Sequence, residues 1–193
     1  DADVYEIARQ LATRMNLEMA ATNEMLAIAC DVKPFWVCLV PEKRAELTTE
    51  GGLDVAGQIT WLTEYIGKLQ AAGIKVSLFI DPEEKQIAAA IECGADAVEL
   101  HTGAYAEASL AADIDMYNAE LKRIKQAVAT AQRSDNKLLI NAGHGLTRDN
   151  VNAIAQIEGI YELNIGHALI ADAVFVGLKQ AVIMMKDAMY ADV

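Results

Sequence analysis

Each of the three histidines, His101, His144 and His167, lies where an apolar run ends. Two of them close the same four-residue pattern, Asn-x-Gly-His, at residues 141–144 and again at 164–167. Histidine transfers protons near neutral pH, and glycine lets the backbone come close to a ligand. Random placement would scatter the histidines, so their clustering predicts a reactive site that works by acid–base chemistry.

Carboxylates occupy comparable positions on earlier apolar runs. Glu18 lies within the run at residues 15–20, and Glu99 lies within the run at 97–103. A carboxylate on a buried strand is costly unless it is paired, which favours a functional role for both. The alternative is structural, because Glu18 can pair with a backbone group or with Arg14.

Structural roles also compete for the other polar residues at these ends. His101 is equally well explained as a residue that caps the turn after its strand, and His167 as one that orients the start of a helix. Asp81 precedes a proline, where an aspartate is more often a helix N-cap than a catalytic residue. His144 has glycines on both sides that packing does not require, which favours function.

Metal binding and imine formation by the protein are the weaker hypotheses. The histidines lie on different expected strands and lack the i, i+4 spacing of zinc motifs. An enzyme that forms an imine with its substrate places a lysine at a strand end. Lys75 and Lys137 instead precede their strands, and Lys43 lies in a loop. We therefore expect no metal and no cofactor.

The two Gly-His turns also predict phosphate binding. The apolar runs before them are short and bounded by turn residues, which is typical of buried parallel strands. Helical periodicity follows each copy, and the N–H groups at a helix start after a Gly-rich turn bind anions. Two such turns on successive strands are typical of the phosphate site after the last two strands of a (β/α)8 barrel.

The elements that must position these side chains alternate as strand and helix. Six strands are expected, within residues 15–20, 35–40, 76–81, 97–103, 138–145 and 162–169. We expect Asp54 to open a helix, Asp81-Pro82 to open the next, and one long helical region to run from Tyr105 to about Arg133. Without hairpin signals between strands, this alternation predicts right-handed βαβ units, a parallel sheet and one α/β domain over residues 1–193.

A TIM (β/α)8 barrel needs eight strands. The chain opens on a helical pattern at residues 2–13, so we expect the first two strands to lie before residue 1 and the barrel to be incomplete at its N-terminus.

Composition narrows the class of protein. The 193 residues are 53% hydrophobic, which suits one sizeable core, and no run of 18 apolar residues predicts a membrane span. The net charge of −12 disfavours nucleic acid as a partner, so a phosphate group must be held locally. Cys30, Cys38 and Cys93 show no CxxC spacing and are expected to be buried free thiols in a reducing compartment, the cytoplasm.

Six stretches together resemble one family, pyridoxine 5′-phosphate synthase of vitamin B6 biosynthesis. They are TRMNLEMA (13–20), CLVPEKRAELTTEGGLDVAGQ (38–58), VSLFIDPEEKQI (76–87), VELHTGAYA (98–106), INAGHGLTRDNV (140–151) and ELNIGHALIADAVFVGLKQAV (162–182). The resemblance implies a (β/α)8 barrel that condenses 1-deoxy-D-xylulose 5-phosphate with 3-amino-2-oxopropyl phosphate. The products are pyridoxine 5′-phosphate, inorganic phosphate and water. It also implies a homo-oligomer, an octamer in the family.

The resemblance assigns roles residue by residue. Glu18 matches the family's general base, His144 its proton donor, and Glu99 the residue that stabilises charge in the transition state. Four positions match residues that bind the two phosphorylated substrates: Thr48, Gly145, Gly166 and His167. We expect the acid–base side chains to converge on a common rim beside two phosphate pockets.

Two motifs of the family do not occur in this sequence. These are an Asn-x-Asp-His on the first strand and a His-x-Arg run after the second, which supply another proton acceptor and much of the substrate contact. We therefore expect these 193 residues alone not to turn over. Two other hypotheses stay open: a phosphosugar isomerase or epimerase barrel that acts on one substrate, and a truncated, non-catalytic subunit.

Overall fold

The computed structural model describes residues 2–42, 51–133 and 138–191, so the predicted substrate-binding residue Thr48 lies outside the described residues. Contacts divide the described chain into two compact units. Residues up to Glu99, with Leu138, form the first unit, and the remaining residues from Leu100 onward form the second. The division falls within one strand, and each unit is described by itself.

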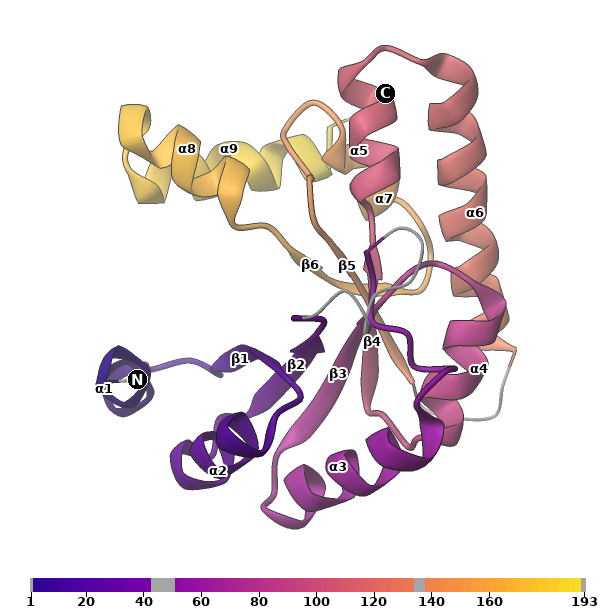
Figure 1. Ribbon diagram of the computed structural model, residues 1–193. Coiled ribbons are helices and arrows are strands. Elements are labelled where there is room, and N and C mark those ends of the chain that lie inside the picture. The colour runs from indigo at the N-terminus through magenta and orange to yellow at the C-terminus, as the bar shows by residue number, and fades with distance from the viewer. Residues whose placement is uncertain (1, 43–50, 134–137, 192–193) are drawn as a thin grey trace. The chain divides into compact units, whose positions relative to one another are not determined.

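The elements alternate as the sequence predicts (Figure 1). The first unit contains α1 (Ala2–Gln10), β1 (Asn16–Ala20), α2 (Asn23–Val32), β2 (Trp36–Val40), α3 (Ile59–Ala71), β3 (Lys75–Ile80), α4 (Glu84–Glu92) and the start of β4 (Ala97–His101). The second contains the end of β4, then α5 (Gly103–Leu110), α6 (Ile114–Gln132), β5 (Leu139–Gly143), α7 (Val151–Ala155), β6 (Ile160–Asn164), α8 (His167–Val176) and α9 (Leu178–Met189).

Strand order follows chain order in both units. In the first, β1, β2, β3 and β4 are neighbours, and in the second, β4, β5 and β6 are. The pairs β1–β2, β2–β3 and β5–β6 are parallel. A parallel sheet needs a crossover between neighbours, and the helices supply it.

Helix ends in the first unit follow local side chains and backbone conformation. Thr22 is the N-cap of α2, as predicted, and its hydroxyl accepts from Met25 N at 3.2 Å. Gly73 follows the end of α3 with φ +84, where a glycine is favoured. The prediction that Asp54 opens α3 is wrong, since the helix begins at Ile59. Asp54 instead accepts from Gly57 N in the preceding turn.

The prediction of one long helical region from Tyr105 to about Arg133, in the second unit, is wrong. That region is two helices, α5 and α6, which pack against each other (Figure 1). The break contains Ala112 with φ +53, and Asp113 then caps α6 by accepting from Met116 N at 3.1 Å. Buried Tyr105 of α5 donates its hydroxyl to Asn150 O at 2.6 Å, which ties the helix to the turn before α7.

The strand β6 is more exposed than predicted. It pairs with β5 in parallel, yet none of its residues is buried and Tyr161 is 58% exposed. The interpretation of both Gly-His strands as buried therefore holds for β5 and is wrong for β6. Among the described residues, no helix has the length and apolarity needed to cross a membrane.

Candidate functional site

Two carboxylates and a thiol gather on neighbouring strands of the first unit. Register places Glu18 of β1 beside Cys38 of β2, and Cys38 beside Ser77 of β3. Glu99 of β4 joins this row, because Cys38 Sγ lies 3.8 Å from Glu99 Oε2 as a weak hydrogen-bond donor. Each of the four residues is the third of its strand, which explains why one face of the sheet collects them.

The burial of the two glutamates differs. Glu99 is 9% exposed, in line with the prediction of a costly buried carboxylate. Glu18 is exposed, because Leu17 and Met19 turn to the buried face of β1. The argument from burial therefore supports Glu99 and is wrong for Glu18.

The thiol of Cys38 is held in its neutral form. Burial raises its pKa well above the ordinary value, and the negative charges of Glu99 and Glu18 raise it further. A hydrogen bond from Ser77 acts in the opposite direction. The Ser77 hydroxyl is buried and has no hydrogen-bond partner of ordinary geometry among the described residues. Cys38 is thus a buried donor beside carboxylates and is poorly suited to act as a nucleophile.

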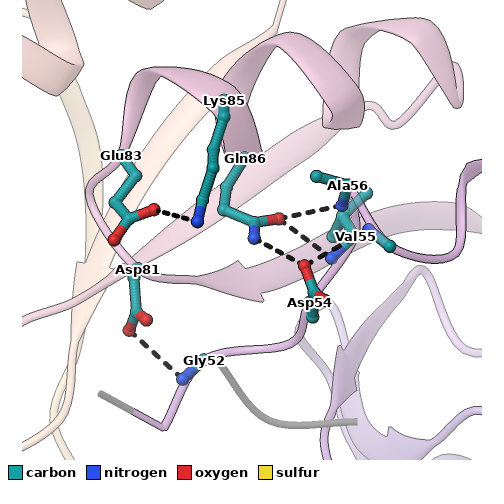
Figure 2. A network of polar contacts seen from close by, with 9 residues as sticks. Gly52, Asp54, Val55, Ala56, Asp81, Glu83, Lys85 and Gln86 are labelled. Carbon is teal, nitrogen blue, oxygen red and sulfur yellow. Dashed lines mark hydrogen bonds and ion pairs between the residues drawn. The ribbon is translucent and has the colours of Figure 1, made fainter. Parts of the chain in front are cut away.

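Asp81 belongs to a structural network in the first unit, shown in Figure 2. Its carboxylate accepts from Gly52 N at 3.2 Å, and the N-cap of α4 is Glu83, so the prediction of Asp81 as N-cap is wrong. Gln86 fixes the same segment, because its buried Oε1 accepts from the N–H groups of Val55 and Ala56 at 2.9 and 3.0 Å. Its Nε2 donates to Oδ1 of Asp54 at 2.8 Å, so the network holds residues 52–56 against β3 and α4.

The first Asn-x-Gly-His copy ends β5 in a tight turn within the second unit. His144 has φ +80 and Gly145 has φ +79, so two successive residues adopt left-handed backbone. A residue with a Cβ is strained there, and such strain is concentrated at functional sites. Gly145 also leaves no room for a side chain, since a Cβ would lie 2.6 Å from Ala106 Cβ. The turn therefore presents an exposed imidazole on a tightly fixed backbone.

A second imidazole lies beside His144. The ring centroids of His101 and His144 are 4.8 Å apart, with the rings tilted by 55°. Gly103 makes space for both rings, because a Cβ there would lie 2.7 Å from His101 Nε2 and 3.4 Å from His144 Cδ2. The structure thus brings together two of the three histidines.

The second copy lies next to the first but differs in form. Register pairs Gly143 with Asn164, so the two turns leave neighbouring strands at one edge of the sheet. Gly166 is the N-cap of α8 and His167 its first residue, and both are exposed. Among the described residues, a Cβ on Gly166 would meet open space. The N–H groups at the start of α8 follow this turn directly, as an anion site requires.

The first turn departs from that prediction. Its helix α7 begins only at Val151, and Asn150 Oδ1 accepts from Thr147 N at 2.8 Å, so no helix start follows Gly145 directly. Arg148 of this segment donates to Asp172 at 2.8 Å and so links the segment after the first turn to α8. Asn141, the first residue of the copy, has a buried Oδ1 without a partner among the described residues.

The predicted site residues therefore form two clusters, each within one unit. Glu18 and Glu99 gather around Cys38 in the first, and His144 lies with His101 and Gly145 in the second. Cys38 is a buried free thiol, as predicted, but the sequence analysis does not place it with the glutamates. The missed signal is that Cys38 is the third residue of its strand, as Glu18 is of its own. In the part of the chain that the structure describes, no three His, Cys, Asp or Glu residues are grouped as metal ligands.

This arrangement suits proton transfer on a phosphorylated substrate. The first unit offers carboxylates and the second offers imidazoles, both of which transfer protons, and the helix start at α8 in the second unit suits a phosphate.

Comparisons with known proteins identify the family. The family model described as pyridoxal phosphate biosynthesis protein PdxJ matches residues 1–191. A pyridoxine 5′-phosphate synthase from Alcanivorax borkumensis is 57% identical over 186 residues, 96% of this chain and 74% of that protein. One from a Synechococcus species is 55% identical over 189 residues, 98% of this chain and 77% of that protein.

Solved structures support the fold alone. A 3-keto-L-gulonate-6-phosphate decarboxylase from Vibrio cholerae has a TM-score of 0.65 at 12% identity and covers 97% of this chain and 78% of its own. A 3-hexulose-6-phosphate synthase from Salmonella typhimurium has a TM-score of 0.63 at 15% identity, with the same coverage. Both are TIM-barrel enzymes, so the six strands with their helices form part of a TIM barrel. The match over nearly the whole chain shows that this protein belongs to the PdxJ family, the pyridoxine 5′-phosphate synthases of vitamin B6 biosynthesis.

Proposed function

We propose that this chain carries the acid–base machinery that condenses 1-deoxy-D-xylulose 5-phosphate with 3-amino-2-oxopropyl phosphate to form pyridoxine 5′-phosphate. The observation that carries the proposal is the identity of 57% with a pyridoxine 5′-phosphate synthase over 96% of the chain. The substrates are phosphorylated, and the turn at Gly166 between β6 and α8 suits a phosphate group.

Three residues have the catalytic roles in this proposal. Glu18 is the general base, and its exposure leaves the carboxylate open to substrate. His144 is the proton donor, and the left-handed turn presents its ring to solvent. Glu99 stabilises charge in the transition state, and its buried position beside a neutral thiol strengthens its electrostatic effect.

The phosphate-binding residues are Thr48, Gly145, Gly166 and His167. The start of α8 offers backbone N–H groups of Gly166 and His167 to an anion. Gly145 contributes close backbone approach, because no side chain fits at that position. Holding both substrates by their phosphates brings the reacting carbonyl and amine together and supplies much of the rate.

The chemistry is a sequence of proton transfers. The amine of one substrate forms an imine with the carbonyl of the other, water and inorganic phosphate are eliminated, and the ring closes. Each step needs an acid or a base of matched pKa, which carboxylates and imidazoles supply. We further propose that the protein works as a homo-oligomer in the cytoplasm.

Product formation from both substrates tests the proposal. The assay uses the 193-residue chain and, in parallel, the same chain joined to the part of the A. borkumensis relative outside the 186 matched residues. We expect the added part to contain the two family motifs that do not occur in this sequence. Mass spectrometry should detect pyridoxine 5′-phosphate with the joined protein only when both substrates are present. Conversion of one sugar phosphate alone would indicate an isomerase or epimerase, and no product from either form would contradict the proposal.

A further inference from the structure

The hydroxyl of Thr102 is turned away from its own helix. Thr102 follows β4 and is the N-cap of α5, where a threonine side chain usually accepts from an N–H of the first helical turn. This side chain makes no such bond. Its Oγ1 lies 2.7 Å from the carbonyl of Gly143 and 2.6 Å from the carbonyl of His144, and the residue is 1% exposed.

These contacts hold both peptide groups that flank the Cα of His144. The Gly143 carbonyl belongs to the peptide before His144 and also accepts from Thr102 N at 2.9 Å. The His144 carbonyl belongs to the peptide after it. The two peptide planes set φ and ψ of His144, and these angles set the direction of its Cα–Cβ bond. One buried residue therefore fixes the direction in which the imidazole leaves the backbone.

The conformation that is held is one that histidine adopts at a cost. At φ +80, a residue with a Cβ is strained, so the turn would relax without outside contacts. Residues on both sides of Thr102 act on the ring itself: His101 packs on it, and Gly103 leaves it space. The segment 101–103 thus contacts both the backbone and the ring of His144.

We infer that Thr102 is a positioning residue of the synthase, and that its hydroxyl directs the imidazole of His144 toward the substrate. This inference rests on the proposed role of His144. The role proposed for the Thr102 hydroxyl is separate from the pairing of neighbouring strands. The N–H of Thr102 already pairs with Gly143, as a neighbouring strand would, and the hydroxyl adds the bond to His144.

The test removes only the hydroxyl. Thr102→Val keeps the shape and the backbone N–H, and Thr102→Ser keeps the hydroxyl. In the joined protein, we expect Thr102→Val to lower kcat about 10- to 100-fold, since misplacing a catalytic group by about 1 Å has an effect of that size. KM for both substrates should stay within about threefold, and Thr102→Ser should restore kcat to within about threefold of the parent.

A matched control separates positioning from stability. Thr22→Val removes a capping hydroxyl from α2 in the first unit, so it should lower the melting temperature and leave kcat unchanged. Equal losses of kcat in Thr22→Val and Thr102→Val would overturn the inference, and so would a parental kcat in Thr102→Val.

A spectroscopic measurement needs no turnover. The chain has three histidines, so isotope-labelled histidine gives three sets of imidazole NMR signals, assigned with His101→Gln and His167→Gln. In Thr102→Val, the His144 signals should move and the His167 signals should stay. If the His144 signals of Thr102→Val match those of the parent protein, the inference is overturned, whether or not the parent protein makes product. If the His144 signals move but the parent protein makes no product, the result counts against the proposed function alone.

Discussion

The strain at His144 can be measured with two substitutions at the same position. His144→Ala and His144→Gly both remove the imidazole and its packing on His101, so they differ only at the backbone. At φ +80, a Cβ costs about 1–2 kcal/mol relative to glycine. Glycine gains about 0.4–1 kcal/mol of extra freedom in the unfolded chain, which offsets part of that difference.

We therefore expect the glycine variant to be more stable than the alanine variant by about 0.8 kcal/mol, the difference between the middle values of these two ranges. For a chain of this size, that difference raises the melting temperature by about 1–4 °C. Both variants should lose product formation about 10²- to 10⁴-fold, because a general acid contributes that much.

Thermal unfolding and the two-substrate assay check the two halves of this prediction. Ala112→Gly is the control, since Ala112 is exposed with φ +53 in the break between α5 and α6. It should gain stability for the same reason and keep full activity. Equal stability of the alanine and glycine variants at position 144 would refute the strain argument, and undiminished turnover would remove His144 from the mechanism.

Three further predictions concern the first unit. Gly52→Ala should lower the free energy of unfolding by about 1–3 kcal/mol, because the new Cβ would lie 2.5 Å from Asp81 N. Gly67→Ala, where the Cβ meets open space on α3, should raise the free energy of unfolding by about 0.5–1 kcal/mol. Urea unfolding compares the two, and similar values would contradict the packing argument. Gln86→Leu should lower the free energy of unfolding by about 2–4 kcal/mol, because it leaves the N–H groups of Val55 and Ala56 without their acceptor. A smaller loss in urea unfolding would show that water replaces the Gln86 amide as the acceptor. Above the ordinary thiol pKa of 9.0, the unfolded Cys38 loses its proton and the folded one keeps it, so stability falls as pH rises, by up to about 1.4 kcal/mol per pH unit. Cys38→Ala should remove that part of the slope in unfolding measured at alkaline pH, and an unchanged slope would show that the thiol ionises alike in both states.

Local patterns were sufficient for the order of the elements and for the ends of most strands. Thr22 was predicted as an N-cap because its hydroxyl acts on a residue three positions away. The turn at His144 and Gly145 was predicted because two glycines that flank a histidine have few purely structural explanations. Each of these features depends on a few adjacent residues.

Features that depend on distant residues were missed. Asp54 was expected to start a helix, but its carboxylate accepts from Gln86, which lies 32 residues further along the chain. Cys38 resembled a packing residue until strand register placed it next to Glu18 and near Glu99. The direction of the Thr102 hydroxyl depends on where β5 ends, 41 residues away. Propensity and periodicity carry no information about such partners.

The break between α5 and α6 had one local signal in the sequence, Asp113, a residue type that is common at helix N-caps. Ala112 adopts positive φ where glycine or asparagine would be expected, so composition favoured one continuous helix. The exposure of β6 was also unpredictable, because an apolar run identifies a strand without showing which faces its neighbours cover.

The stoichiometry of phosphate release tests the central claim most directly. The two substrates carry one phosphate each, and the ring product carries one. With the joined protein and both substrates, inorganic phosphate and pyridoxine 5′-phosphate should therefore appear in equal amounts. Phosphate released without ring product, or ring product formed without release of phosphate, would contradict the assignment of this chain's residues to that condensation.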